Sequence, residues 1–487
     1  MSKKIKIVHI VSEIAPFSKT GGLADVARSL PKALKRLGHD VTIITPLYGR
    51  AIDKDEYHLK LILENIDVRL NSQESVKVNY WRGYLMDGLP VYFIENKKFF
   101  SKHKKIYGST RENARFLVFN VAALKLLSLL KLSVDIIHCH DWQTGLIPHY
   151  LKTDFRYSKT LKNAKTIFTI HNLIFQLGHN WWEIPLEKKD YGRGKVPHLD
   201  DPKLETINFA KRAILSADLI NTVSEQYREE IMTKKFGQDL QRILRNRSDR
   251  LFGIINGIDY NTYNPAKDEN LYKRYSLGNL QEKKENKKYL QKKIGLPVLD
   301  VPILCTTSRV TFQKGFNLIL KIIDHLLKLN IQLVFLGDGN KEYISPIKKL
   351  QKKHKDKLVW LPFSKRAKDE SLLYAASDLF LLPSNHEPCG INQLIAMRYG
   401  CIPIVRAIGG LQDTVENFNP VLNKGTGFTF KAEDEILFYA AIIRALENYK
   451  HQKAWQGLVR RAMSKSTSWE IPARKYVKLY QKMLKVK

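Results

Sequence analysis

The sequence predicts an α/β protein made of two doubly wound, Rossmann-like domains that face each other across a cleft. Short apolar runs typical of buried parallel strands alternate with longer amphipathic patterns of helical period. The 487 residues exceed one ordinary hydrophobic core, so two domains are expected. A turn at residues 255–258, followed by a polar, lysine-rich stretch, separates two series of this alternation. We therefore expect an N-terminal domain over residues 1–255 and a C-terminal domain over residues 256–467.

The first series begins with a strand, a loop and an amphipathic helix, whose buried face is predicted to contain Leu23, Val26, Ala27, Leu30, Leu34 and Leu37. Gly38 is expected to end this helix before the second strand of a right-handed βαβ unit. The strands expected in the first series are 4–11, 40–45, 91–95, 134–138, 166–170 and 218–223, with an apolar helix over 114–130. Those of the second series are 302–307, 331–337, 358–361, 378–382 and 401–405, with a final helix over 471–484.

The composition, 44% hydrophobic and 10% aromatic, is that of a globular protein. A formal net charge of +33 raises the possibility of nucleic-acid binding. The lysines are dispersed over helices and loops, however, and we find no zinc-finger spacing, RNP aromatic motif or heptad-linked basic region. We interpret the charge as a lysine-biased solvated surface and expect no nucleic-acid partner, although part of it could steer an anionic ligand.

The cysteines predict a reducing compartment, because none shows metal-ligand or CxxC spacing. They are Cys139, Cys305, Cys389 and Cys401, and we expect reduced thiols in a cytoplasmic protein. Lys6 and His9 interrupt the N-terminal apolar run, so no signal peptide is expected. No uncharged apolar run reaches the length of about 18 residues that crossing a membrane requires.

An acidic residue and a pair of glycines follow two predicted strands of the second series. Glu387 comes just after the strand 378–382, and Gly409-Gly410 follows the strand 401–405. Open α/β sheets bind ligands at the carboxyl ends of their strands, and glycines let backbone N–H groups approach a ligand closely. Either feature alone is most simply an ordinary surface residue or turn. Together, in this order, they predict a sugar-nucleotide type of site.

The segment carrying these residues, EPCGINQLIAMRYGCIPIVRAIGGLQDTV, resembles the nucleotide-binding half of bacterial glycogen synthases and plant starch synthases. The broader group of retaining GT-B glycosyltransferases has a second Glu eight residues after the first, where this chain has Ile395. The single acid followed by Gln393-Leu394 is similar to the glycogen and starch synthase branch. The resemblance covers nearly the whole chain, and it implies that a C-terminal helix over residues 468–487 completes the N-terminal domain.

The string KTGGLADV, residues 19–26, joins the first predicted strand to its helix. Gly21 and Gly22 free backbone N–H groups at a helix N-terminus, and Lys19 adds a mobile point charge. The string matches the N-terminal signature of the family without a gap. The resemblance implies that Lys19 contacts phosphate or the growing glucan and that Asp25 orients the loop. The alternative for Asp25 is stabilisation of the helix dipole.

The string HCHDWQ, residues 138–143, resembles a metal cluster in composition. Adjacent strand residues point to opposite faces, so we expect that its two histidines and Asp141 do not all converge. The resemblance places Asp141 near the acceptor, Trp142 in packing, and His171, at the end of the next strand, beside the donor glucose.

The string SRVTFQKG, residues 308–315, places Arg309 and Lys314 around a helix N-terminus, where two cations suit a diphosphate. These cations can stabilise a leaving diphosphate, so we expect no metal cofactor. The only Asp-x-Asp sequence, at residues 53–55, lies in a charged loop and is predicted to be solvated. Gly337-Asp338-Gly339 lacks the third glycine of a dinucleotide fingerprint, which argues against a dehydrogenase.

The resemblance implies a retaining glycogen synthase that transfers glucose from ADP-glucose to the non-reducing end of an α-1,4-glucan. Glu387 would then hold hydroxyls of the donor sugar rather than act as a nucleophile. The chain departs from the family at Asn385-His386, Ile408 and Lys102, which bear on nucleotide preference and catalytic efficiency. Two alternatives stay open: a GT-B enzyme that transfers from a UDP-sugar to another glycoconjugate, and a catalytically weak glucan-binding protein.

Overall fold

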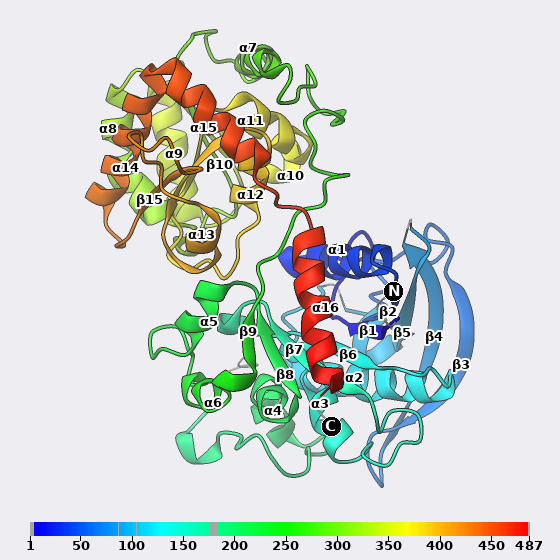
Figure 1. Ribbon diagram of the computed structural model, residues 1–487. Coiled ribbons are helices and arrows are strands. Elements are labelled where there is room, and N and C mark those ends of the chain that lie inside the picture. The colour runs from blue at the N-terminus through cyan, green and yellow to red at the C-terminus, as the bar shows by residue number, and fades with distance from the viewer. Residues whose placement is uncertain (1–3, 86, 104, 176–183, 486–487) are drawn as a thin grey trace. The chain divides into compact units, whose positions relative to one another are not determined.

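A computed structural model describes residues 4–485 except residues 86, 104 and 176–183 (Figure 1). The chain forms two compact units. Unit 1 comprises Met1–Asn256 and Pro472–Lys487, and unit 2 comprises Gly257–Ile471. The sequence placed these divisions after residues 255 and 467, whereas the structure places them after Asn256 and Ile471.

The described residues of unit 1 form a nine-stranded sheet in the order β3-β4-β5-β2-β1-β6-β7-β8-β9. Its strands are parallel except at one edge, where β4 runs antiparallel to both β3 and β5. The strands are β1 (Lys6–Ile10), β2 (Asp40–Pro46), β3 (Lys60–Arg69), β4 (Ser75–Leu85), β5 (Leu89–Glu95), β6 (Ile136–His140), β7 (Lys165–Ile170), β8 (Leu219–Thr222) and β9 (Leu251–Gly253). The helices are α1 (Gly22–Arg36), α2 (Glu112–Leu129), α3 (Leu146–Lys152), α4 (Phe209–Ser216), α5 (Glu225–Ile231), α6 (Gln241–Arg245) and α16 (Glu470–Lys485).

The strand order of unit 1 changes direction at β1, because the chain adds β2 on one side of it and β6 on the other. The loops that follow β1 and β6 therefore diverge at their carboxyl ends, which is where a doubly wound sheet binds ligands. These loops contain the KTGGLADV and HCHDWQ motifs.

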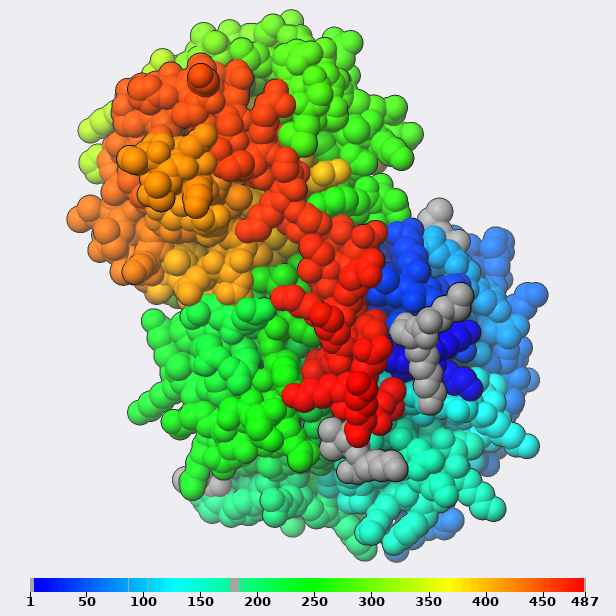
Figure 2. Space-filling view, in the orientation of Figure 1, coloured from blue at the N-terminus to red at the C-terminus, as the bar shows by residue number. Residues whose placement is uncertain are grey.

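The final helix, α16, packs on the sheet of unit 1 through two buried tyrosines. The Tyr480 hydroxyl lies 2.7 Å from His138 Nδ1 on β6, and Asn221 on β8 donates to the Tyr476 hydroxyl at 2.8 Å. The space-filling view shows the outer side of the helix as a red ridge on this unit (Figure 2). Residues from opposite ends of the chain thus share one core.

Unit 2 is a six-stranded parallel sheet in the order β12-β11-β10-β13-β14-β15. Its order changes direction at β10, so the loops after β10 and β13 flank its switch point. The strands are β10 (Ile303–Thr307), β11 (Gln332–Leu336), β12 (Leu358–Leu361), β13 (Leu379–Leu382), β14 (Ile402–Arg406) and β15 (Phe428–Phe430). The helices are α7 (Lys283–Lys293), α8 (Phe316–Lys328), α9 (Lys341–Lys353), α10 (Phe363–Arg366), α11 (Glu370–Ala376), α12 (Asn392–Arg398), α13 (Gly409–Thr414), α14 (Glu435–Lys450) and α15 (Gln452–Ser464).

The predicted fold class is confirmed for each unit, and two details of the prediction were wrong. The strand expected at 134–138 is β6, Ile136–His140. Just before this strand, the Asp135 carboxylate accepts a hydrogen bond from the backbone N–H of Lys6 at 2.8 Å, in addition to the backbone bonds that Asp135 makes with Lys6 and Lys165. The antiparallel pair β3 and β4 was not predicted, because β3 has a largely exposed surface and lacks a regular apolar alternation.

Among the described residues, no helix has the length and hydropathy that crossing a membrane requires. The four cysteines are buried free thiols.

Replacing Tyr480 with Phe tests how strongly α16 is anchored. The change leaves a buried nitrogen of His138 without its partner, which costs about 1–3 kcal/mol. We expect a lower thermal midpoint in calorimetry, whereas Tyr157→Phe, at a residue 82% exposed, should leave it unchanged. Equal midpoints for the two variants would show that the contact adds no stability.

Candidate functional site

The two loops at the switch point of unit 2 are bonded to each other. The backbone N–H of Asn385 donates to the Gln313 carbonyl at 2.9 Å, and the Asn385 side chain donates to the Phe312 carbonyl at 3.0 Å. The Gln313 amide in turn donates to the His386 carbonyl at 3.2 Å. Asn385 and His386 depart from the family pattern, and in this chain they form part of the contact between the loops.

Gly315 sets how closely these loops approach. It has φ 77°, and a Cβ at this position would lie 2.0 Å from the Pro383 carbonyl oxygen. Only glycine tolerates both conditions. The residue before it, Lys314, is thereby held against the loop that follows β13.

Lys314 and Glu387 form the polar centre of unit 2. Lys314 Nζ lies 2.5 Å from Glu387 Oε2, and the side chains are 17% and 8% exposed. The Ser384 hydroxyl donates to the same carboxylate oxygen at 3.1 Å. The structure therefore brings together two predicted site residues from neighbouring loops, whereas the sequence did not identify Ser384.

The surroundings of this pair are positively charged and partly desolvated. Arg309 lies on the Lys314 loop with an exposed side chain, 3.5 Å from the Gln313 amide oxygen. Burial lowers the pKa of His386 to about 4; Lys314 lowers it further and Glu387 opposes the shift. His386 is thus neutral at pH 7, and Arg309 and Lys314 supply the cationic charge of these loops.

The pair Gly409-Gly410 approaches the loop that carries Glu387. A Cβ at Gly409 would lie 2.1 Å from the Glu387 carbonyl oxygen, and one at Gly410 would lie 2.1 Å from the Cys389 carbonyl oxygen. The Gly410 N–H donates to the Glu387 carbonyl at 3.1 Å. The sequence assigned these glycines to close approach of a ligand. The close approach that the structure shows is to the chain itself, and their contact with a ligand stays a prediction.

The loop after β1 in unit 1 is organised by Glu13, which the sequence did not identify. Its carboxylate accepts hydrogen bonds from the Thr20 backbone N–H at 2.6 Å and the Thr20 hydroxyl at 2.8 Å. Burial raises the pKa of Glu13. On the same loop, Lys19 Nζ lies 2.8 Å from Asp25, and both side chains are partly exposed. A Cβ at Gly22 would meet no atom within 4 Å, and one at Gly21 only Glu13 at 3.9 Å, so packing does not require glycine at either position.

Asp141 and His171, predicted from different strands, lie side by side. The Asp141 carboxylate accepts a hydrogen bond from the His171 backbone N–H at 2.7 Å. Asp141 has φ 58°, an uncommon conformation for a residue with a side chain. Trp142 packs its ring against Phe116, with centroids 5.3 Å apart, as predicted.

His171 belongs to a histidine cluster with His9, His138 and His140. His9 Nδ1 lies 3.0 Å from His140 Nε2, and His140 Nδ1 lies 2.9 Å from His171 Nε2. The rings of His138 and His140 stack with centroids 4.1 Å apart. The sequence treated His9 only as an interruption of an apolar run, and a histidine within a buried strand was the available signal.

Within the described part of the chain, ligand nitrogens of His9, His138 and His140 lie within 4.8 Å of one another. Both nitrogens of His138 already contact hydroxyl groups, those of Tyr480 and Thr169, at 2.7 Å. Imidazole lone pairs lie in the ring plane, so the stacked rings of His138 and His140 cannot direct theirs to one ion. This geometry favours hydrogen bonding over metal binding. Asp141 does not join the cluster and binds the His171 backbone instead.

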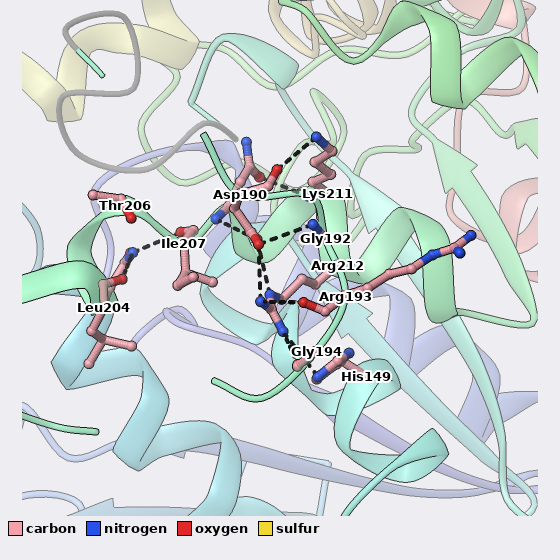
Figure 3. Close-up of polar contacts among 12 residues, drawn as sticks. His149, Asp190, Gly192, Arg193, Gly194, Leu204, Thr206, Ile207, Lys211 and Arg212 are labelled. Carbon is pink, nitrogen blue, oxygen red and sulfur yellow. Dashed lines mark hydrogen bonds and ion pairs between the residues drawn. The ribbon is translucent and has the colours of Figure 1, made fainter. Parts of the chain in front are cut away.

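A buried ion pair organises the loop that precedes α4 (Figure 3). Asp190 receives two hydrogen bonds from the Arg212 guanidinium, both at 3.0 Å. Arg212 also contacts His149 at 3.1 Å and donates to the carbonyls of Arg193 and Gly194. This clamp fixes residues 190–194 on α4, and the sequence did not identify it.

Two doubly wound units, one with a lysine–carboxylate pair at its switch point, are the framework of a nucleotide-sugar glycosyltransferase. Comparison with known proteins identifies the family to which the chain belongs. Residues 6–246 match the family described as starch synthase catalytic domain, and residues 287–459 match glycosyl transferases group 1. The chain belongs to the glycogen synthase and starch synthase family, and it is a glycosyltransferase.

Full-length relatives support this assignment. A glycogen synthase of Geotalea daltonii is 38% identical over 99% of both chains, and one of Pseudothermotoga lettingae is 37% identical over 99% of this chain and 100% of its own. The catalytic domain of starch synthase IV from Arabidopsis thaliana, solved bound to ADP and acarbose, has a TM-score of 0.86 and 34% identity, covering 99% of this chain and 100% of that chain. A sucrose-phosphate synthase from Thermosynechococcus elongatus has a TM-score of 0.59 at 17% identity, covers 99% of this chain and 100% of that chain, and shares the fold.

The histidine cluster predicts that unit 1 loses stability in mild acid. Burial lowers the pKa of His9 and His171 from 6.5 to about 3, and lowers those of His138 and His140 well below 6.5. Below pH 6.5 the unfolded chain binds protons that the folded unit excludes, so stability falls as pH decreases toward about 3. The slope is up to about 1.4 kcal/mol per pH unit for each histidine.

Thermal unfolding between pH 7 and pH 5 measures this slope. His138→Gln should flatten it, whereas His451→Gln, at an exposed position in unit 2, should not. A midpoint that does not change with pH would contradict the proposed neutral cluster.

Substitutions in unit 2 test the predicted donor site. A charge-assisted hydrogen bond contributes about 1.5–3 kcal/mol, so Arg309→Ala and Lys314→Ala should each lower kcat/KM by at least roughly tenfold. Glu387→Gln should lower kcat more than nucleotide affinity, because its predicted partner is the sugar. The matched control is Lys353→Ala, at an exposed lysine at the end of α9. Control-like kinetics in all three variants, with intact folds, would remove the assignment.

Proposed function

We propose that the chain is a retaining glycogen synthase that transfers glucose from ADP-glucose to the non-reducing end of an α-1,4-glucan. The observation that carries this proposal is the pairing of Lys314 with Glu387 at the switch point of unit 2. Support comes from full-length relatives named glycogen synthase and from the similarity to a starch synthase domain bound to ADP and acarbose.

Lys314 and Arg309 would bind the diphosphate of the donor. An ammonium group has three N–H donors, so Lys314 can keep its bond to Glu387 and still donate to phosphate oxygens. The two cations would stabilise the negative charge that develops on the leaving diphosphate. We propose no metal cofactor, because these side chains can supply the electrostatic stabilisation.

Glu387 would hold hydroxyls of the donor glucose. In the proposed reaction, the bond between C1 of glucose and the diphosphate oxygen breaks, and a bond from C1 to the acceptor 4-oxygen forms on the same face of the sugar. The proton of the acceptor hydroxyl passes to the leaving phosphate. This step needs no second carboxylate.

In unit 1, Asp141 would lie near the acceptor and His171 beside the donor glucose, while Lys19, Gly21 and Gly22 would contact phosphate or glucan. His171 has a pKa lowered to about 3, so it would bind the sugar as a neutral ring. The proposed setting is the cytoplasm, where the thiols of Cys305 and Cys401, 4.0 Å apart, would remain reduced.

A GT-B transferase that uses a UDP-sugar is the second candidate, favoured by the departures at Asn385, His386 and Ile408. Against it, Asn385 and the His386 backbone connect the two loops in this chain. Ile408 is buried at the start of α13. These roles account for the departures without a change of donor.

A glucan-elongation assay with purified full-length protein tests the proposal. We expect elongation of glycogen and maltooligosaccharides, faster with ADP-glucose than with UDP-glucose, and the same rate with and without EDTA. Strict dependence on added Mn²⁺ or Mg²⁺ would overturn the metal-free mechanism. Faster transfer from a UDP-sugar to a non-glucan acceptor would favour the second candidate, and no transfer with any donor would favour a glucan-binding protein.

A further inference from the structure

Three histidines of unit 1 form a continuous hydrogen-bonded chain. His9 contacts His140, and His140 contacts His171, at 3.0 and 2.9 Å. His140 uses both ring nitrogens in these contacts. A neutral imidazole has one N–H and one lone pair, so His140 must donate on one side and accept on the other. The direction of one bond therefore fixes the direction of the other.

The row of three hydrogen-bonded histidines has one N–H proton more than the two bonds between its rings require. Three neutral rings supply three N–H groups, and two of these form the bonds between the rings. The third is located at one end, either on Nε2 of His9 or on Nδ1 of His171. The low pKa values of these histidines support the neutral state of all three rings.

The two ends have different surroundings. His9 is completely buried, and its Nε2 has no hydrogen-bond partner among the described residues. His171 is half-buried at the carboxyl end of β7, and the part of the chain that the structure describes supplies no partner for its Nδ1. A buried N–H that lacks an acceptor is costly and rare in proteins. The third proton is therefore more stable on His171.

We propose that His9 is a positioning residue that, through His140, fixes His171 as a hydrogen-bond donor at Nδ1. His9 donates from Nδ1 to His140, and His140 donates from Nδ1 to His171, which leaves Nδ1–H of His171 for a ligand. The group that it recognises is an oxygen with a free lone pair, such as a sugar hydroxyl oxygen. The identity of this ligand rests on the proposed function, whereas the order of the protons does not.

This arrangement has a distinct spectroscopic signature. All three rings adopt the Nδ1–H tautomer, although neutral histidine in water favours Nε2–H. In the reverse order all three would be Nε2–H. We expect nuclear magnetic resonance of the full chain with ¹⁵N- and ¹³C-labelled histidine to show a protonated Nδ1 in each ring, without any ligand. Signals are assigned by single substitutions. A protonated Nε2 on His140 or His171 would overturn the proposal.

Substitution of His9 tests its effect on the reaction. His9→Asp places a carboxylate oxygen, which accepts but cannot donate, near the position of Nδ1, so a neutral His140 must donate from Nε2 and the Nε2–H form of His171 should become populated. The value of kcat/KM should fall by about five- to tenfold, as expected for one neutral hydrogen bond to substrate. His9→Asn places an amide N–H near the position of Nδ1, so it should restore the tautomer and most of the rate.

Tyr480→Phe is the matched control, because it weakens unit 1 through His138, outside the chain of three rings. It should lower stability and leave both the His171 tautomer and the rate unchanged. A His9→Asp protein in which His140 is neutral and the His171 tautomer is unchanged would overturn the proposal, and failure of His9→Asn to keep the Nδ1–H tautomer would also count against it. The spectroscopic measurement needs no substrate, so its result is independent of the elongation assay. The tautomer can be wrong while glucan is elongated, and it can be right while no glucan is elongated.

Discussion

The bonding between the loops after β10 and β13 is the constraint on which the candidate donor site depends. Lys314 and Glu387 are far apart in sequence, and each lies on a loop that could adopt many conformations. Three hydrogen bonds through Asn385 and Gln313 hold the two loops in one conformation. The close approach of the loops at Gly315 contributes to this. The conformational entropy of the loops is thus lost on folding, before any ligand binds. Because the loops are already ordered, more of the free energy of each contact with a ligand contributes to binding.

The same principle operates in unit 1 with different chemistry. A buried carboxylate, that of Glu13, holds the KTGG loop, and the Asp141 carboxylate holds the backbone of His171. The loops of unit 1 are thus held by acidic side chains, whereas those of unit 2 are held by amide groups. Asp141 is also a predicted site residue. In unit 1 Glu13 is 2% exposed, so its role is internal.

The sequence predicted most of the fold because buried parallel strands are short apolar runs separated by amphipathic helices. It predicted Lys314 and Glu387 from their places after strands, and the structure shows that they are in contact. It did not identify Ser384 or His9, because their importance depends on partners distant in sequence. In the sequence, His9 is only a polar residue within an apolar strand, and its contact with His140 is seen only in the structure. The glycines at 409 and 410 were predicted to allow close approach of a ligand, whereas in the structure the loop that carries Glu387 approaches them.

The position of α16 has a consequence for the order in which the protein is made. Tyr476 and Tyr480 complete the core of unit 1, yet they are synthesised more than 250 residues after their partners Asn221 and His138. Every residue of unit 2 precedes them in the chain. On the ribosome, unit 2 can therefore reach its full set of contacts first, although unit 1 begins synthesis earlier. Unit 1 lacks these tyrosine contacts until α16 has left the ribosome, so its core is completed only after the whole of unit 2 has been synthesised.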